Sequence, residues 1–112
     1  MACALDLLGD RWTLLVVRDL FLGSRYFEEF LGSPEGIATN ILSDRLKLLM
    51  AQGLVEKLPD EADRRRHIYM LTRRGKTLRK VLIPLTRWGL EQFPGTKTKP
   101  KTNLDAWTSD AR

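Results

Sequence analysis

Residues 32–58 read GSPEGIATNILSDRLKLLMAQGLVEKL, and this stretch decides the fold. It begins with a turn, since Pro34 blocks a helix and Gly32 and Gly36 both permit positive φ. A helix is predicted over 38–52, with Gly53 at the position that follows a helix C-terminus. Residues 54–58 then have the character of a short strand. Turn, helix and strand in this order predict the second half of a helix-turn-helix followed by a β-hairpin.

The chain on the C-terminal side completes the hairpin. A second strand is predicted over 67–71, and the loop between the strands, 59–66, changes from acidic to basic residues. Thr72 is expected to cap a last helix that runs to about Phe93, with a kink at Pro84. The hairpin directly behind a helix-turn-helix would be the wing of a winged helix.

The chain on the N-terminal side supplies three further helices. A short helix containing Leu5 and Leu8 should end at Gly9, and Asp10 should cap a second helix that ends at Gly23. Ser24 is expected to cap a third, short helix over 26–31. The fold class is therefore mainly α (α+β): a winged helix-turn-helix with a two-stranded β-wing and a long C-terminal dimerisation helix.

We expect one domain over residues 1–93, which suits a chain of 112 residues. Residues 94–112 are rich in Pro, Thr and Lys and are predicted to be a flexible basic tail. Trp107 is the one tail residue with a side chain suited to docking.

Charge is distributed unevenly along the chain. Residues 1–63 contain 6 Lys and Arg against 11 Asp and Glu, whereas residues 64–112 contain 13 against 3. Eight basic side chains and no acidic one occur between Arg64 and Lys80. Such a concentration favours a polyanionic partner, although a solvated basic face would look the same.

The predicted helix 38–52 has two faces at 100° per residue. Two sets of residues result: a face expected to be buried, with Ala38, Leu42, Leu46 and Leu49, and an opposite polar face, with Asn40, Ser43, Asp44 and Lys47 and with Thr39 at its margin. Asn can pair with adenine in the major groove, and Ser, Thr or Lys can bind bases or phosphates. Asp44 is unfavourable near DNA, and we expect it to orient Arg45 or Arg25 instead.

The hairpin tip carries three consecutive arginines that repel one another, which suggests minor-groove and phosphate contacts. Asp63 is expected to brace one guanidinium. The candidate DNA-binding residues are Thr39, Asn40, Ser43, Arg45, Lys47, Arg64, Arg65, Arg66 and Arg25.

Apolar residues recur along the last predicted helix beyond what one small core can cover. Pairing this stripe with the first helix of a second copy would make a homodimer and place two recognition helices one DNA turn apart. The candidate interface residues are Leu5, Leu8, Val81, Leu82, Leu85 and Trp88. Core packing is nevertheless the main role expected of the Trp12 and Trp88 side chains.

Other classes of protein fit the composition poorly. One Cys and one His give too few ligands for a disulfide framework or a zinc site within one chain, so no metal and no cofactor are expected. No phosphate loop or catalytic spacing of Ser, His, Asp or Cys is present, so the chain is not expected to be an enzyme. Asp6 and Asp10 interrupt the apolar start, and no stretch is long enough to span a membrane, so a cytoplasmic location is expected.

Several stretches resemble the HxlR-type regulators, a family related to the MarR winged-helix group. LLGDRWTLLVVRDL at 7–20 with GSRYFEEF at 23–30 is similar to the opening of that family, and LSDRLKLL at 42–49 with GLV at 53–55 is similar to its recognition helix. Asp63-Arg64-Arg65 with Leu71-Thr72 and Gly75 resembles a MarR wing. The resemblance implies a homodimer that binds double-stranded operator DNA, often as a repressor.

Many HxlR-type proteins carry a sensing Cys ahead of the first helix, but Cys3 lies about four residues later than that position. A redox-sensing role of Cys3 is therefore the weaker reading, and a small apolar residue is the simpler one. Trp12, Tyr26, Phe27 and Phe30 could line a pocket for an unknown small-molecule inducer, although core packing explains them more simply. The alternative function is a winged-helix module that binds protein or RNA without operator specificity; a metal sensor using acidic residues at a dimer interface is a third.

Overall fold

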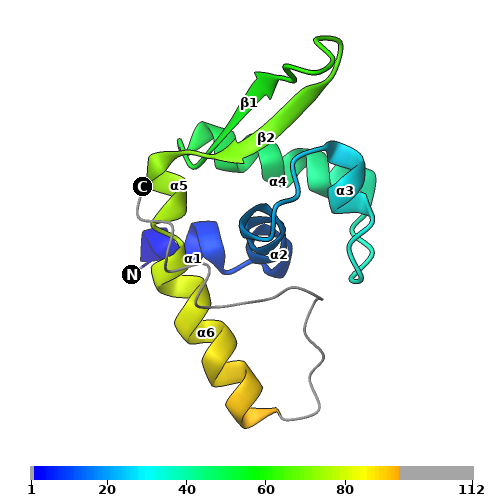
Figure 1. Cartoon of the computed structure of the whole chain (residues 1–112). Helices are drawn as coiled ribbons and strands as arrows, with labels where there is room; N and C mark the ends of the chain where they lie inside the picture. The colour runs from blue at the N-terminus through cyan, green and yellow to red at the C-terminus, as the bar shows by residue number, and fades with distance from the viewer. Residues whose placement is uncertain (1, 94–112) are drawn as a thin grey trace.

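The computed structural model describes residues 2–93 and has the predicted element order as far as the second strand, after which the last helix is divided in two (Figure 1). Six helices and one two-stranded antiparallel sheet are found in this part of the chain. Their bounds are α1 Ala2–Leu8, α2 Arg11–Phe21, α3 Phe27–Leu31, α4 Thr39–Ala51, β1 Val55–Pro59, β2 His67–Leu71, α5 Arg73–Lys76 and α6 Arg79–Gln92. The predicted tail at 94–112, with Trp107, lies outside the described residues.

Asp10 caps α2 as predicted. Its Oδ2 accepts hydrogen bonds from the Thr13 backbone N–H at 2.9 Å and from the Thr13 hydroxyl at 3.1 Å. The inner face of α2 buries Val16 and Val17 at the centre of the core. The helix ends before Gly23, whose φ of 103° is accessible to glycine without a steric cost.

Tyr26, not Ser24, is the N-cap residue of α3, so that prediction was wrong. The reason is a carboxylate on the first turn: Glu29 Oε1 accepts from the backbone N–H groups of Arg25 and Tyr26, both at 2.9 Å. This contact satisfies two backbone donors at the start of α3 that have no partner within the helix. The turn to α4 then uses positive φ at Gly36 (68°), whereas Gly32 keeps a φ of −78°.

The wing pairs Val55 with Leu71 and Pro59 with His67 in antiparallel register. Only the end near the body is covered: Val55 and Tyr69 are buried, and most other residues of the two strands are exposed or half-buried. Figure 1 shows the hairpin extending beyond α3 and α4. The outer part of the wing therefore has little apolar packing of its own.

The predicted single helix from Thr72 to Phe93 is instead two helices, α5 and α6. Thr72 caps only α5, by accepting from the Gly75 N–H at 3.0 Å. Between the helices the backbone N–H groups of Thr77, Leu78, Lys80 and Val81 bond to carbonyls three residues earlier, which is a tightened 3₁₀-type turn. Pro84 lies within α6.

Gly75 allows α5 to lie very close to the backbone before β1. A Cβ built on Gly75 would lie 2.0 Å from the carbonyl oxygen of Leu54, so α5 packs directly on the backbone that leads into β1. The same oxygen accepts from the Thr72 N–H at 3.0 Å. This close approach holds the end of the wing against the start of α5.

One hydrophobic cluster joins α2, α3, α4, both strands and the start of α6. Leu42, Leu46 and Leu49 are at most 1% exposed, which confirms them on the buried face of α4, whereas Ala38, the N-cap residue, is exposed and was wrongly placed on that face. Within residues 2–93, no helix has the length and apolar character that a membrane span requires.

Candidate DNA-binding surface

The exposed face of α4 is the one that the helical wheel predicts. Thr39, Asn40, Asp44 and Lys47 are exposed, while Ser43 is half-buried at the edge of this face. Ala38 is the extended N-cap residue, so Thr39 and Asn40 lie on the first turn. The polar face therefore begins at the N-terminal end of α4, the part of such a helix that enters a major groove.

Arg45 lies on the flank of α4 that faces α2. Its Nε donates to Asp10 Oδ2 at 2.6 Å, and its Nη2 lies 3.3 Å from Asp10 Oδ1. The hydrogen bonds from Arg45 and Thr13 lower the pKa of Asp10 to about 2. Asp10, and not Asp44 as expected, is thus the hydrogen-bonded partner of Arg45, and a DNA contact by Arg45 would have to compete with this ion pair.

The wing tip presents Arg64 and Arg65 to solvent. The Arg65 side chain is 92% exposed, and Asp63 Oδ1 accepts from its backbone N–H at 3.1 Å and from its Nε at 3.3 Å. Asp63 therefore braces the neighbouring guanidinium, as the sequence predicts. No hydrogen bond or ion pair holds the exposed Arg64 side chain within the described part of the chain.

Arg66 differs from the two arginines before it, because it points back to α3. Its guanidinium pairs with Glu28, and its central carbon lies 3.9 Å from the centroid of the Tyr26 ring. Arg66 is thus held against α3 at the end of the wing loop, directly before β2. The sequence places it with the tip arginines, and nothing in the run of three distinguishes it from them.

Tyr26 also binds the first residue of the wing loop. Its hydroxyl donates to Asp60 Oδ2 at 2.6 Å, and Asp60 is only 8% exposed. This hydrogen bond raises the pKa of Tyr26 and lowers the pKa of Asp60. Sequence reasoning missed this contact, because an aspartate after Pro59 in a charged loop looks like a solvated residue.

Arg25 sits where the wing meets the segment before α3. Its side chain is exposed, and its carbonyl oxygen accepts from the Tyr69 N–H at 2.8 Å. This backbone hydrogen bond connects the segment before α3 to β2. Arg25 therefore remains a candidate for a phosphate contact beside the wing.

The turn between α3 and α4 is held by a second cluster that the sequence did not reveal. Arg18 Nη1 donates to Glu35 Oε2 at 2.7 Å, and Arg18 Nη2 bonds to Ser33, Glu35 and Asp19 at 2.8–2.9 Å. These hydrogen bonds lower the pKa of Glu35 to about 2. The cluster ties the C-terminal half of α2 to the turn and so fixes where α4 begins.

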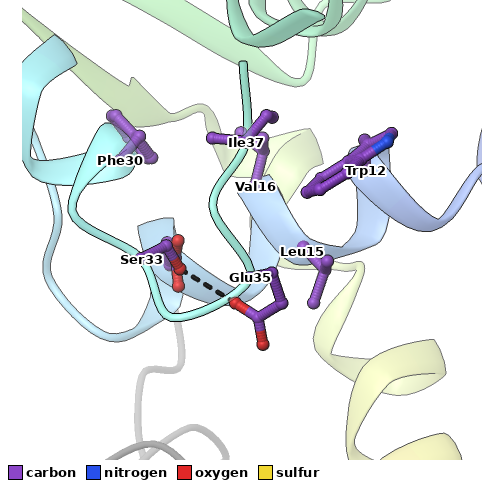
Figure 2. A pocket seen from close by; sticks show the side chains of 8 residues that line it. Trp12, Leu15, Val16, Phe30, Ser33, Glu35 and Ile37 are labelled. Carbon is purple, nitrogen blue, oxygen red and sulfur yellow. Dashed lines mark hydrogen bonds between the residues drawn. The ribbon is translucent and has the colours of Figure 1, made fainter. Parts of the chain in front are cut away.

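Figure 2 shows the cavity beside this cluster, with Trp12, Leu15 and Val16 of α2 facing Ile37 and Glu35. Its volume is about 10 Å³, which suits about one water molecule and not an organic inducer. Phe30 lines it and is fully buried, which fits core packing. Tyr26 and Phe27 instead line an open groove of about 310 Å³ between α3 and the wing.

The candidate dimer residues divide into exposed and covered ones. Leu5, Val81, Leu85 and Trp88 are 44–59% exposed, so Trp88 is not a core residue. Leu82 is 4% exposed and Leu8 is half-buried against the core, so Leu82 is not free to pair with a second copy. Figure 1 shows α6 extending away from the remaining helices.

Cys3 is exposed on α1, so it is not a buried small apolar residue. No group of three or more His, Cys, Asp or Glu residues is arranged to hold a metal within residues 2–93.

A family model and several known proteins match most of this chain. The family described as HxlR-like helix-turn-helix matches residues 7–97. An HTH-type transcriptional regulator of Mycobacterium tuberculosis is 40% identical over 97 residues, which cover 87% of this chain. The match spans only 61% of that relative's own length.

Two solved structures show the same architecture. The reduced form of the transcriptional regulator YodB from Bacillus subtilis has a TM-score of 0.69 at 34% identity, covering 86% of this chain and 95% of YodB. A structure described as a possible HxlR family transcriptional factor from Thermoplasma volcanium has a TM-score of 0.71 at 33% identity, covering 82% of this chain and 83% of that one. The overall architecture described above is thus shared with regulators of known structure.

Proposed function

This chain belongs to the HxlR-like helix-turn-helix family, and from that premise we propose that it is a transcriptional regulator that binds double-stranded operator DNA as a homodimer. The observation that carries the proposal is the pairing of two exposed elements. The polar face of α4 carries Asn40 and Lys47, and the wing tip carries Arg64 and Arg65. A helix that reads bases in the major groove needs an exposed polar face. A hairpin that contacts the DNA backbone or the minor groove needs exposed basic residues.

Within this proposal the candidate residues have different roles. Asn40, Thr39 and Ser43 would contact base edges, because short hydrogen-bonding side chains at the start of the helix can reach them. Lys47, Arg25, Arg64 and Arg65 would contact phosphates or the minor groove. Repression is the expected effect, since a protein seated on promoter DNA excludes other proteins from it.

The dimer part of the proposal is supported by the exposed apolar face of α6. Val81, Leu85 and Trp88 are 44–56% exposed, and Trp88 contacts Phe93 edge to face at 6.1 Å. Large apolar side chains gathered on one exposed helix face mark an interaction surface. A second copy would cover them, with Leu5 of α1 as a further contact.

The DNA-binding test begins with selection of bound duplexes from a random pool, followed by fluorescence anisotropy at several salt concentrations. If a dimer makes about eight phosphate contacts, the slope of log K against log[salt] should be near −7. Competition with single-stranded DNA and with RNA should fail to displace the selected duplex. Salt-independent binding, or equal competition by RNA, would contradict the proposal and favour a protein- or RNA-binding module.

The dimer is tested by analytical ultracentrifugation of Leu85→Asp, which places a charge on the exposed face of α6. The mass should fall from that of a dimer toward that of a monomer. The matched control is Glu91→Ala, an exposed residue on the same helix, which should leave the dimer intact. An unaltered dimer in Leu85→Asp would place the interface elsewhere.

A further inference from the structure

The wing needs stabilising contacts from outside its own two strands. An isolated two-stranded hairpin is marginally stable in water, and the outer half of this one has few buried residues. Its base is fixed by the Tyr69 N–H bond to the Arg25 carbonyl and by core packing of Val55. Neither contact reaches the loop that carries Arg64 and Arg65.

Asp60 supplies the contact farther out. One carboxylate oxygen accepts from the Tyr26 hydroxyl at 2.6 Å, and the other accepts from the Ala62 N–H at 3.1 Å. The Asp60 backbone N–H donates to the Arg66 carbonyl at 3.0 Å. Asp60 therefore closes the wing loop and attaches it to α3 through one side chain.

Arg66 contacts the same tyrosine through the tyrosine ring. Its guanidinium lies over the Tyr26 ring and pairs with Glu28 in the first turn of α3. The loop enters at Asp60 and leaves at Arg66, and both ends are bound to Tyr26. Two independent attachments on one rigid ring restrict rotation of the loop relative to the helix-turn-helix.

We propose that Tyr26, Asp60 and Arg66 form a clamp that sets the position of the wing tip relative to α4, and that Arg66 is a positioning residue and not a DNA contact. This inference rests on the proposed DNA-binding function, because its consequence is that Arg64 and Arg65 reach DNA only when the clamp is closed. Opening the clamp should then remove wing contacts without removing any charge from the protein.

The variant that weakens the clamp is Tyr26→Phe, which deletes the hydroxyl that binds Asp60 and keeps the ring under Arg66. The matched control is Tyr69→Phe: Tyr69 lies in the same region, and no hydrogen bond of its hydroxyl is found in residues 2–93. Tyr26→Phe should reduce the magnitude of the salt slope by about as much as Arg65→Ala does, which is roughly 1 for each phosphate that the wing no longer binds. Tyr69→Phe should leave the slope unchanged.

A double-mutant cycle separates positioning from general damage. Arg65→Ala should weaken DNA binding several-fold in the native background and much less in the Tyr26→Phe background. Fully additive losses would overturn the clamp. Arg66→Lys is a second measurement: a phosphate contact would survive this change, whereas the clamp requires Arg66→Lys to behave like Arg66→Ala.

Amide hydrogen exchange tests the clamp without DNA. Exchange at the Asp60 amide should be faster in Tyr26→Phe than in the native protein or in Tyr69→Phe, because the loop opens more often. Unchanged exchange would overturn the clamp. If the native protein binds no duplex in a salt-sensitive way, the proposed function fails, and the exchange result still decides whether the clamp exists.

Discussion

The helix-turn-helix and the wing are held in place by different physical means. Apolar packing positions α4, through Leu42, Leu46 and Leu49, which are at most 1% exposed. The wing beyond Val55 and Tyr69 is positioned by hydrogen bonds, an ion pair and a cation–π contact to α3. One of the two elements proposed to contact DNA is thus fixed by burial and the other by a few polar contacts, so the two should respond differently to mutation.

The largest expected effect is on the packed element. Leu46→Ala should lower the free energy of unfolding by about 2–5 kcal/mol, because it leaves a cavity under α4. The matched change is Lys47→Ala on the exposed face, which should stay within about 0.5 kcal/mol and weaken DNA binding instead. Urea unfolding measures both. Equal destabilisation by the two changes would break the distinction between packed and exposed faces of α4.

The next largest effect concerns a polar contact within the helix-turn-helix, the ion pair of Glu35 with Arg18. Glu35→Gln should cost roughly 1.5–3 kcal/mol at neutral pH by weakening charged hydrogen bonds to Arg18. The folded pKa of about 2 lies below the ordinary value of 4.5, so this stabilisation is present above about pH 4.5 and is lost as the pH falls toward 2. Thermal melts across this window should show a smaller acid loss in Glu35→Gln.

Glu61→Gln is the control for the acid series, since it removes an exposed carboxylate of the wing loop. Its melting temperature should follow that of the native protein at each pH. An acid profile of Glu35→Gln identical to that of the native protein would mean that the Arg18 cluster contributes nothing to the stability of the turn.

Asn40→Ala tests the exposed face of α4 for base reading. It should cost about 1–3 kcal/mol of discrimination at one operator position in each half-site and leave stability nearly unchanged. Binding to a panel of single-base operator variants measures this. Equal loss on every sequence would assign Asn40 to a phosphate, and the major-groove role would rest on Thr39 and Ser43.

The smallest effect belongs to the wing tip. Arg65→Ala should weaken binding to all sequences to a similar degree and reduce the magnitude of the salt slope by about 1 for each phosphate left unbound. Its side chain is 92% exposed, so the unfolding transition should not move. Affinity and slope that both match the native values would remove the wing from the DNA-binding surface.

The sequence predicts the packed parts of the molecule well. Leucines at 42, 46 and 49 place the core face of α4, Asp10 caps α2, and β2 occupies the predicted residues His67–Leu71. These features depend on local periodicity and on contacts between residues three or four apart. Such contacts can be recognised from the sequence alone, because they do not depend on the tertiary fold.

The polar contacts between distant segments were not predictable. Arg45 meets Asp10 across 35 positions, Tyr26 meets Asp60 across 34, and Arg18 meets Glu35 across 17. Nothing local distinguishes these charges from solvated ones, because their partners are chosen by the tertiary fold. For the same reason the sequence did not reveal that Arg66 pairs with Glu28, and it extended one helix across the tight turn after Lys76.

Gly75 limits how freely this chain can vary. Any side chain there would overlap the Leu54 carbonyl, whereas nothing lies within 4 Å of the Cβ position at Gly89 on α6. In a saturation library selected for folded protein, position 75 should retain glycine alone, and position 89 should accept alanine and larger residues. Substitutions are therefore expected to be tolerated at position 89 and on the exposed face of α4, but not where α5 rests on the entry to the hairpin.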